Sequence, residues 1–308
     1  MNNKWLGLIL IFLIGIFIGS KLLKKNNDRS FESDFIQVDT AQLDKIIVHP
    51  KDVSGTEFSL TKIDDEWNVS QGEINTLAMG SKVNALMSTI AGIKATRVVA
   101  KSPDKWGTYD VDEEKGQRIE LFENGKKTDE IILGRFDFNQ QTRSAKSYIR
   151  HLDDDNVYVV DGFLSMTLGQ AYDAYRNKII INATAKNINS IDMTYGIDKI
   201  QLRKENYWVS ASNQVVDSLV MDEYINTIAN INGKNIIDNP QLSDQPAATL
   251  KVGQSNGQTT TISAFIGAET DFVLNSSSNP NTYFSSDSTG VYARIFNDLI
   301  EYINVVDN

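Results

Sequence analysis

The sequence holds few residues whose type and spacing could support catalysis or metal binding. His151 stands just before Asp153, Asp154 and Asp155, and imidazole and carboxylate groups together can bind a metal ion. Consecutive carboxylates point in different directions along a strand, however, and the tip of a hairpin uses Asp for its turn geometry. A calcium-binding loop would instead alternate its ligands and end in a late Glu. We therefore expect a turn at this point, and neither a metal site nor a bound cofactor.

Nucleophile motifs are equally sparse. Two Ser-x-x-Lys sequences occur, at residues 59–62 and 102–105. A β-lactamase-type serine begins a helix, whereas the first motif lies in an expected strand and the second contains Pro103. The chain has no Gly-x-Ser-x-Gly, phosphate-loop, dinucleotide-binding or His-Glu-x-x-His motif. We predict no catalytic residues and a non-enzymatic protein; an envelope glycan hydrolase with carboxylates dispersed along the chain remains an alternative.

The candidate binding residues are two tyrosines and an arginine. Tyr172, Tyr175 and Arg176 lie close together in the segment that separates the two halves of the chain. Tyrosine and arginine are over-represented at binding hot spots, so this group could form a patch for a partner or a ligand. The alternative is that Tyr172 and Tyr175 pack on one helix face and fix the angle between the halves. Both interpretations stay open at this level.

Composition narrows the remaining function classes. The chain has 308 residues, a formal net charge of −10, two histidines and no cysteine. Residues 1–29 contain five Lys or Arg against one Asp, a local charge of +4, so residues 30–308 carry −14. Phosphate binding needs a Lys/Arg surface, so an acidic body argues against a nucleic-acid partner. The absence of cysteine excludes disulfides, thiolate metal sites, cysteine nucleophiles and a lipoprotein anchor.

The N-terminal segment has the composition of a membrane anchor. Residues 5–20 are 16 consecutive uncharged positions, and snorkelling of Lys21 extends the stretch through residue 23, to 19 positions. At about 1.5 Å per residue a helix of that length spans roughly 28 Å, against a hydrocarbon core of about 30 Å. The run is long and continues directly into lysines, which favours a retained anchor over a cleaved signal peptide. We expect an anchor at residues 1–25 that contacts the membrane through residues 5–23, and a linker at 26–40.

Charge alone leaves the side of the membrane ambiguous. The segment after the apolar run carries four Lys or Arg residues within nine positions, and the positive-inside rule then places the body in the cytoplasm. Long domains can cross the membrane largely regardless of flanking charge. The charge pattern therefore leaves both orientations open.

The body alternates strand-like and helix-like segments. Residues 57–63 show the period-2 pattern of a strand, and apolar residues at helical spacing predict a helix that begins at Ser81. Asn124 and Gly125, between two apolar runs, predict a β-hairpin. Residues 146–160 predict another hairpin, followed by a short helix.

The second half repeats this order of elements. Trp67 and Trp208 are separated by 141 positions, and Gly134 and Gly267, each at the end of a hairpin strand, by 133. Offsets that agree within about eight residues indicate duplication of a domain, since loop lengths change easily. We expect an α+β fold, with an N-terminal transmembrane helix followed by two tandem, duplicated, mostly antiparallel α+β domains. The expected domain boundaries are residues 41–180 and 181–308.

These features together resemble a known family. The shared pattern is a strand ending in Trp67, a helix, a Tyr-centred segment at residues 106–109, an Asn-Gly hairpin at residues 119–134 and a pair of Tyr-rich strands. The pattern is similar to an uncharacterised bacterial domain family that also forms part of GldG-type gliding-motility auxiliary subunits of ABC transporters. The similarity covers most of residues 41–304, although the second half lacks a clear Tyr-Gly segment.

The resemblance implies a membrane-tethered accessory protein whose large domain lies on the extracytoplasmic, periplasmic side of the inner membrane. The family supplies no catalytic residues to map onto this chain. We therefore expect a single-pass, membrane-anchored, non-enzymatic scaffold or accessory subunit. Its expected partner is a membrane protein, such as an ABC-transport or gliding-type complex. A ligand-binding module with its site between the repeats, and the envelope glycan hydrolase, are the alternatives.

Overall fold

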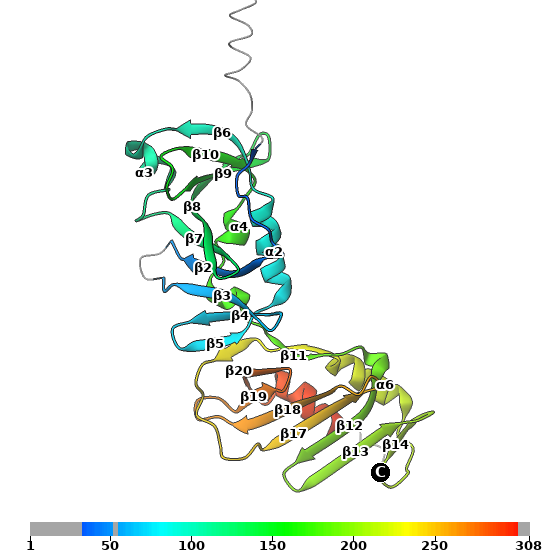
Figure 1. The fold of residues 1–308 in the computed structure, drawn as a ribbon. Coiled ribbons are helices and arrows are strands. Elements are labelled where there is room, and N and C mark those ends of the chain that lie inside the picture. Colours follow the sequence, from blue (N-terminus) through cyan, green and yellow to red (C-terminus); the bar gives the residue numbers. More distant parts are fainter. Residues whose placement is uncertain (1–32, 52–54, 301–308) are drawn as a thin grey trace, which may run out of the picture. The chain divides into compact units, whose positions relative to one another are not determined.

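The computed structural model describes residues 33–51 and 55–300, and most of their secondary structure is antiparallel strand (Figure 1). Contacts within the chain divide it into two units. Unit 1 comprises Met1–Gly55 and Ala85–Gln170, and unit 2 comprises Thr56–Asn84 and Ala171–Asn308. The division falls inside α2 (Gly80–Ala91), the longest helix among the described residues.

Unit 1 is built on antiparallel strands in the order β1-β6-β10-β9-β8-β7-β2. The strands are β1 (Ser33–Asp34), β2 (Leu43–His49), β6 (Lys94–Ala100), β7 (Gln117–Glu123), β8 (Lys126–Asn139), β9 (Ser144–His151) and β10 (Val157–Asp161). The helical elements are a 3₁₀ turn (Pro103–Lys105), α3 (Trp106–Tyr109) and α4 (Ser165–Leu168). The predicted Asn-Gly hairpin is confirmed, since Asn124 and Gly125 join β7 to β8 with positive φ angles of 51° and 75°.

The packing of unit 1 fixes where its strands can begin and end. Val111, in the turn before β7, packs with Ile132 of β8 and Val157 of β10 in one core cluster. Gly134 lies where β8 passes this turn, and a Cβ there would be 2.2 Å from the carbonyl oxygen of Tyr109. The backbone can make this close approach only because residue 134 has no side chain.

Unit 2 contains the meander β3-β4-β5, the pair β11-β15 and a sheet in the order β14-β13-β12-β17-β18-β19-β20-β16. The strands are β3 (Phe58–Ile63), β4 (Glu66–Gln71), β5 (Ile74–Leu77), β11 (Ile179–Asn182), β12 (Ile188–Tyr195), β13 (Asp198–Lys204), β14 (Trp208–Ser210), β15 (Asn230–Asn232), β16 (Asn235–Ile237), β17 (Ala248–Gln254), β18 (Thr259–Ile266), β19 (Phe272–Ser276) and β20 (Asn279–Ser286). The helical elements are α5 (Tyr172–Tyr175), a 3₁₀ turn (Ala185–Asn187), α6 (Ser218–Ile228) and a π-helical turn (Ala293–Asn297).

The core of unit 2 forms where α6 and the π-helical turn pack against the sheet. Trp208, Tyr224, Phe284 and Phe296 are all buried in one cluster. The Tyr224 hydroxyl donates a 2.7 Å hydrogen bond to the carbonyl oxygen of Ile295, which ties the two helical segments together. Trp208 is therefore part of the core of unit 2, whereas Trp67, at the other position of the 141-residue spacing, is only partly buried.

The expected fold class is wrong for the part of the chain that the structure describes. Strands and helices are both present, but antiparallel sheet dominates, and α2 and α6 are the only described α-helices longer than four residues. Segments with a period-2 pattern outnumber segments with helical spacing. The short helix expected after Asp161 is the single turn α4. Among the described helices, none combines the length and the apolar character needed to cross a membrane. The expected transmembrane helix falls on residues 5–23, outside the described residues, and the domain boundaries remain a prediction.

Candidate functional site

Tyr172, Tyr175 and Arg176 come together in unit 2, but as buried residues. Their exposed fractions are 7%, 1% and 3%. The chain here runs antiparallel to the end of β5, with the amide of Asn177 donating to the carbonyl oxygen of Leu77 at 2.9 Å. These backbone contacts orient all three side chains toward the protein interior. The three residues singled out from the sequence therefore lie together, but their side chains are buried.

Arg176 is the charged centre of this cluster. Its Nη2 and Nη1 atoms donate to the two carboxylate oxygens of Asp238, at 2.6 and 3.1 Å. Asp173 lies 3.6 Å away, and the guanidinium carbon is 5.2 Å from the centre of the Tyr172 ring. Burial lowers the pKa of Arg176, but the hydrogen bond to Asp238 and the nearby charges outweigh it and raise the pKa. The guanidinium therefore stays charged beneath the surface.

One buried polar atom of the same cluster, the Nε of Arg176, has no hydrogen-bond partner, whereas the hydroxyls of Thr76 and Tyr172 interact with each other. Burial raises the pKa of Tyr172. It also raises the pKa of Tyr175, whose ring lies 5.6 Å from that of Phe58, to about 12. Both tyrosines are therefore neutral near pH 7 and can act as hydrogen-bonding groups but not as bases.

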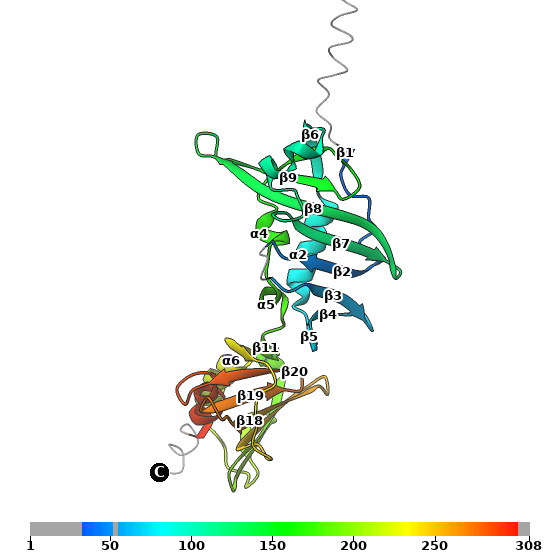
Figure 2. The same ribbon diagram turned by 90° about the vertical axis from the view of Figure 1, so that its left-hand side faces the viewer.

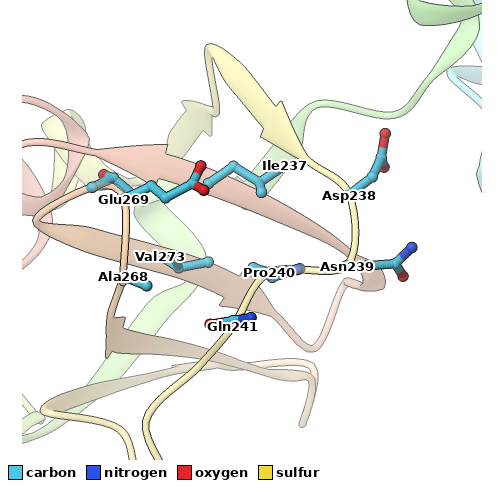
Figure 3. Close-up of a pocket in the computed structure, with 9 residues that line it drawn as sticks. Ile237, Asp238, Asn239, Pro240, Gln241, Ala268, Glu269 and Val273 are labelled. Atoms are coloured by element: carbon cyan, nitrogen blue, oxygen red, sulfur yellow. The ribbon is translucent and has the colours of Figure 1, made fainter.

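A small pocket begins beside Asp238 (Figure 3). It has a volume of about 260 Å³ and is lined by Ile237, Asp238, Asn239, Pro240, Gln241, Ala268, Glu269, Thr270 and Val273. In Figure 3 the Glu269 side chain points toward Ile237, whereas Asp238 and Asn239 project from the loop on the other side. Carboxylate, amide and hydroxyl groups around an apolar floor can hydrogen-bond a small polar ligand that carries hydroxyl or amino groups.

Each of the two histidines lies beside a different carboxylate in unit 1. His49 Nε2 lies 2.7 Å from a carboxylate oxygen of Glu120. His151 Nδ1 lies 2.9 Å from a carboxylate oxygen of Asp129, and its Nε2 lies 3.0 Å from the carbonyl oxygen of Phe35. Burial lowers the pKa of His151, but the hydrogen bond with Asp129 outweighs it and raises the pKa.

The turn expected after His151 is confirmed. Asp154 accepts hydrogen bonds from the backbone amide of Asn156 at 2.9 Å and from the hydroxyl of Tyr158 at 2.7 Å. Within the described ranges, no group of three His, Asp or Glu residues is arranged to hold a metal ion. Among the three consecutive aspartates, Asp154 therefore stabilises the turn.

Sequence reasoning missed a protruding hairpin in unit 1, formed by the ends of β8 and β9, which we call the arm (residues 134–147; Figure 2). Phe136 and Phe138 of the arm are each 49% exposed, and their ring centres lie 5.1 and 5.5 Å from that of Phe163. Met166, in α4, is 68% exposed. The alternation of Phe136 and Phe138 with polar residues was a readable strand signal, but it does not distinguish a solvent-facing strand from a buried one.

A second pocket lies at the base of the arm. It has a volume of about 270 Å³ and is lined by Lys51, Gln117, Leu133, Gly134, Arg135, Phe136 and Ser165. Lys51 is 3.7 Å from a carboxylate oxygen of Asp110, and Arg135 is 3.7 Å from one of Asp137. Both ion pairs are long and solvent-exposed, and such pairs are weak. Two cations therefore face this pocket without a strong partner.

A comparison with protein families gives one match, to a domain of unknown function (DUF4340), over residues 67–252. The chain belongs to the DUF4340 family. The DUF4340 match includes the arm and the cluster around Arg176, whereas Lys51 and Glu269 lie outside it. No curated protein and no solved structure gives a significant match.

The DUF4340 assignment confirms the expected membership of a family of unknown function. It assigns no reaction, ligand or partner to either pocket. The features of this DUF4340 protein that bear on its function are therefore its surfaces and its polar clusters.

Proposed function

We propose that this protein is a membrane-anchored, non-enzymatic accessory subunit of the bacterial cell envelope that binds a membrane-protein partner. Its partner would be an ABC-transport or gliding-type complex, as the resemblance to GldG-type auxiliary subunits suggests. Residues 5–23 would hold the chain in the inner membrane, with the body on the periplasmic side. The observation that carries the proposal is the exposed aromatic surface of the arm.

This surface consists of Phe136 and Phe138, whose rings contact that of the partly buried Phe163, together with the exposed Met166 of α4, and we call it the arm surface. Isolated exposed apolar side chains are common in soluble proteins, but a contiguous group that includes aromatic rings marks an interaction site. Aromatic residues and Met are also enriched where proteins contact one another. The arm surface therefore supports a binding role and requires no catalytic group.

The carboxyl groups give little support to the hydrolase alternative. A glycosidase acid needs a raised pKa. Among the described carboxyl groups with a shifted pKa, all three are lowered. The hydrogen bond from Ser102 lowers the pKa of Asp104. For Glu120 and Asp154 burial raises the pKa, but hydrogen bonds and nearby cations outweigh it.

The proposal is tested by capture from detergent-solubilised membranes with the full-length protein. Phe136→Ser/Phe138→Ser removes the two rings of the arm, and Ile266→Ser is the matched control, because Ile266 is an exposed apolar residue of unit 2. We expect the control to retain the same integral membrane protein as the wild type and the double variant to lose it. Equal capture by all three proteins, or no reproducible membrane partner, would contradict the proposal.

A ligand-binding module is a second candidate function, favoured by one observation. The unpartnered Nε of Arg176 and the pocket beside Asp238 lie within unit 2. Soaking the protein with small polyols and amines and following the chemical shifts of the amides of residues 237–241 tests this candidate. Unchanged shifts at millimolar ligand would remove it.

A further inference from the structure

The outer edge of β8 is open along the arm. β7 pairs with β8 only as far as the Gln117–Leu133 pair, whereas β9 continues to pair with β8 through Phe136–Ser147 and Asn139–Ser144. Among the described residues, no strand lies along the other side of residues 136–139. Unpaired N–H and C=O groups on a strand edge are a template for another extended chain.

The arm is a well-ordered hairpin with two different faces. Phe136 and Phe138 lie on the face that contacts Phe163. On the other face Asp137 accepts a 2.6 Å hydrogen bond from the Tyr148 hydroxyl. At the tip, the side chain of Asn139 accepts hydrogen bonds from the backbone amides of Gln141 and Thr142. These contacts hold the edge extended before any partner arrives.

The fold does not need this extension to connect two strands. In unit 2 the hairpin of β18 and β19 closes directly, with Ile266 paired to Phe272. In unit 1 the pairing of Leu133 with Ile149 is followed by a register shift and then by the whole arm. The arm thus extends beyond the length at which the unit 2 hairpin closes, and it presents two half-exposed aromatic rings to solvent.

The pocket at the base of the arm supplies the charge preference. It lies where β7 begins, at Gln117, and therefore next to the open edge of β8. Lys51 and Arg135 face it with side chains 46% and 43% exposed. Residues 30–308 carry a net charge of −14, whereas this pocket presents two cations whose ion pairs are weak. A carboxylate group of a ligand would complement their positive charge.

We infer that the open edge of β8 binds an extended, acidic segment of the partner polypeptide by strand addition. The segment hydrogen-bonds to those backbone groups of residues 136–139 that point away from β9, places apolar side chains against Phe136 and Phe138, and places a carboxylate between Lys51 and Arg135. Main-chain bonds then supply affinity and the pocket supplies specificity, as in other strand-addition complexes. This inference rests on the proposed function and names the chemistry by which the arm would recognise its partner.

The test uses amide hydrogen exchange of the full-length protein with two synthetic heptapeptides. One is acetyl-Thr-Val-Glu-Val-Glu-Val-Thr-amide, and the other has Lys in place of both Glu residues. At ten times its dissociation constant, a ligand that closes the edge slows exchange of the amides it covers about tenfold. We expect this for residues 136–139 with the Glu peptide, and unchanged exchange with the Lys peptide.

Charge reversal provides the control. Lys51→Glu/Arg135→Glu should reverse the preference, so that the Lys peptide now slows exchange of residues 136–139. The matched control Lys199→Glu/Lys251→Glu changes charge equally at exposed positions of unit 2 and should behave as the wild type. Far-UV circular dichroism checks that each variant is folded.

Three results would overturn the inference: no slowing with the Glu peptide, equal slowing with both peptides, or slowing confined to other strands. None of these decides the proposed function, because capture of a membrane partner through the aromatic rings is measured separately. If capture of the membrane partner requires Phe136 and Phe138 while neither peptide slows amide exchange of residues 136–139, the partner binds the arm by side chains alone.

Discussion

The two partners of the Arg176–Asp238 ion pair should contribute unequally to the stability of unit 2. Asp238→Asn leaves a guanidinium that is only 3% exposed without the carboxylate that it contacts at 2.6 and 3.1 Å. Removing one partner of a buried pair costs about 3–5 kcal/mol. Asp173, 3.6 Å away, compensates in part. We therefore expect a loss near the lower limit, about 3 kcal/mol.

Arg176→Met should cost much less. The side chain of Asp238 is 39% exposed, so its carboxylate is rehydrated when the arginine is removed. Methionine fills the volume of the arginine stem, and the buried Nε that has no partner disappears. The variant still loses the charge-assisted hydrogen bonds to Asp238. With the two compensating effects included, we expect the free energy of unfolding to fall by about 1 kcal/mol. The double variant should resemble Arg176→Met alone, because the charge that burial penalises is then absent.

Urea-dependent hydrogen exchange of β17 and β18 measures the free energy of unfolding of unit 2, and exchange of β7 and β8 in unit 1 is the internal control. The expected order of destabilisation is Asp238→Asn, then Arg176→Met, with unit 1 unchanged. If Arg176→Met destabilises unit 2 as much as Asp238→Asn, or if the two losses add in the double variant, the burial argument is wrong.

Three further predictions follow from single contacts. The pKa of His151 is raised in the folded state, so its contribution to stability is complete below the unfolded pKa of about 6.5 and is lost as the pH rises through the folded pKa. The free energy of unfolding in urea should therefore lose this pH dependence in the His151→Gln variant. Gly233→Ala should cost about 1–3 kcal/mol, because its Cβ would lie 2.1 Å from the Phe284 ring, whereas Gly80→Ala, with open space, should be neutral or stabilising in the same assay. Phe136→Ser/Phe138→Ser should change the unfolding free energy by less than about 1 kcal/mol, since both rings are half-exposed; a larger loss would mean that the arm serves folding.

Local patterns predicted the local features of this fold. Apolar residues at helical spacing predicted a helix from Ser81, and α2 spans Gly80–Ala91 with Leu86 and Ile90 buried. The Asn124-Gly125 turn and the turn after His151 were equally readable, because their geometry depends on adjacent residues. The dominance of sheet was not predicted, since short apolar segments fit a strand or a helix until their partners are known.

The environment of Tyr172, Tyr175 and Arg176 could not be read in the same way. The residues that decide it, Phe58 and Asp238, are distant in the sequence and meet the cluster only after the strands have paired. A tyrosine and arginine cluster has the same composition whether it faces solvent or protein. The burial of this polar cluster is therefore set by tertiary contacts that its own composition does not encode.

The exposure of the arm has its cause in a turn that precedes β7. Asp112 accepts hydrogen bonds from the amides of Glu114 and Lys115, and its carbonyl oxygen accepts one from Gly116 at 2.9 Å. A Cβ at Gly116 would lie 2.2 Å from the Ile132 side chain, so the chain turns tightly against β8 at this point. Consequently β7 cannot start before residue 117, and β8 continues beyond Leu133 without a neighbour on that side. The same turn that closes the core of unit 1 therefore creates the open edge on which the proposed recognition depends.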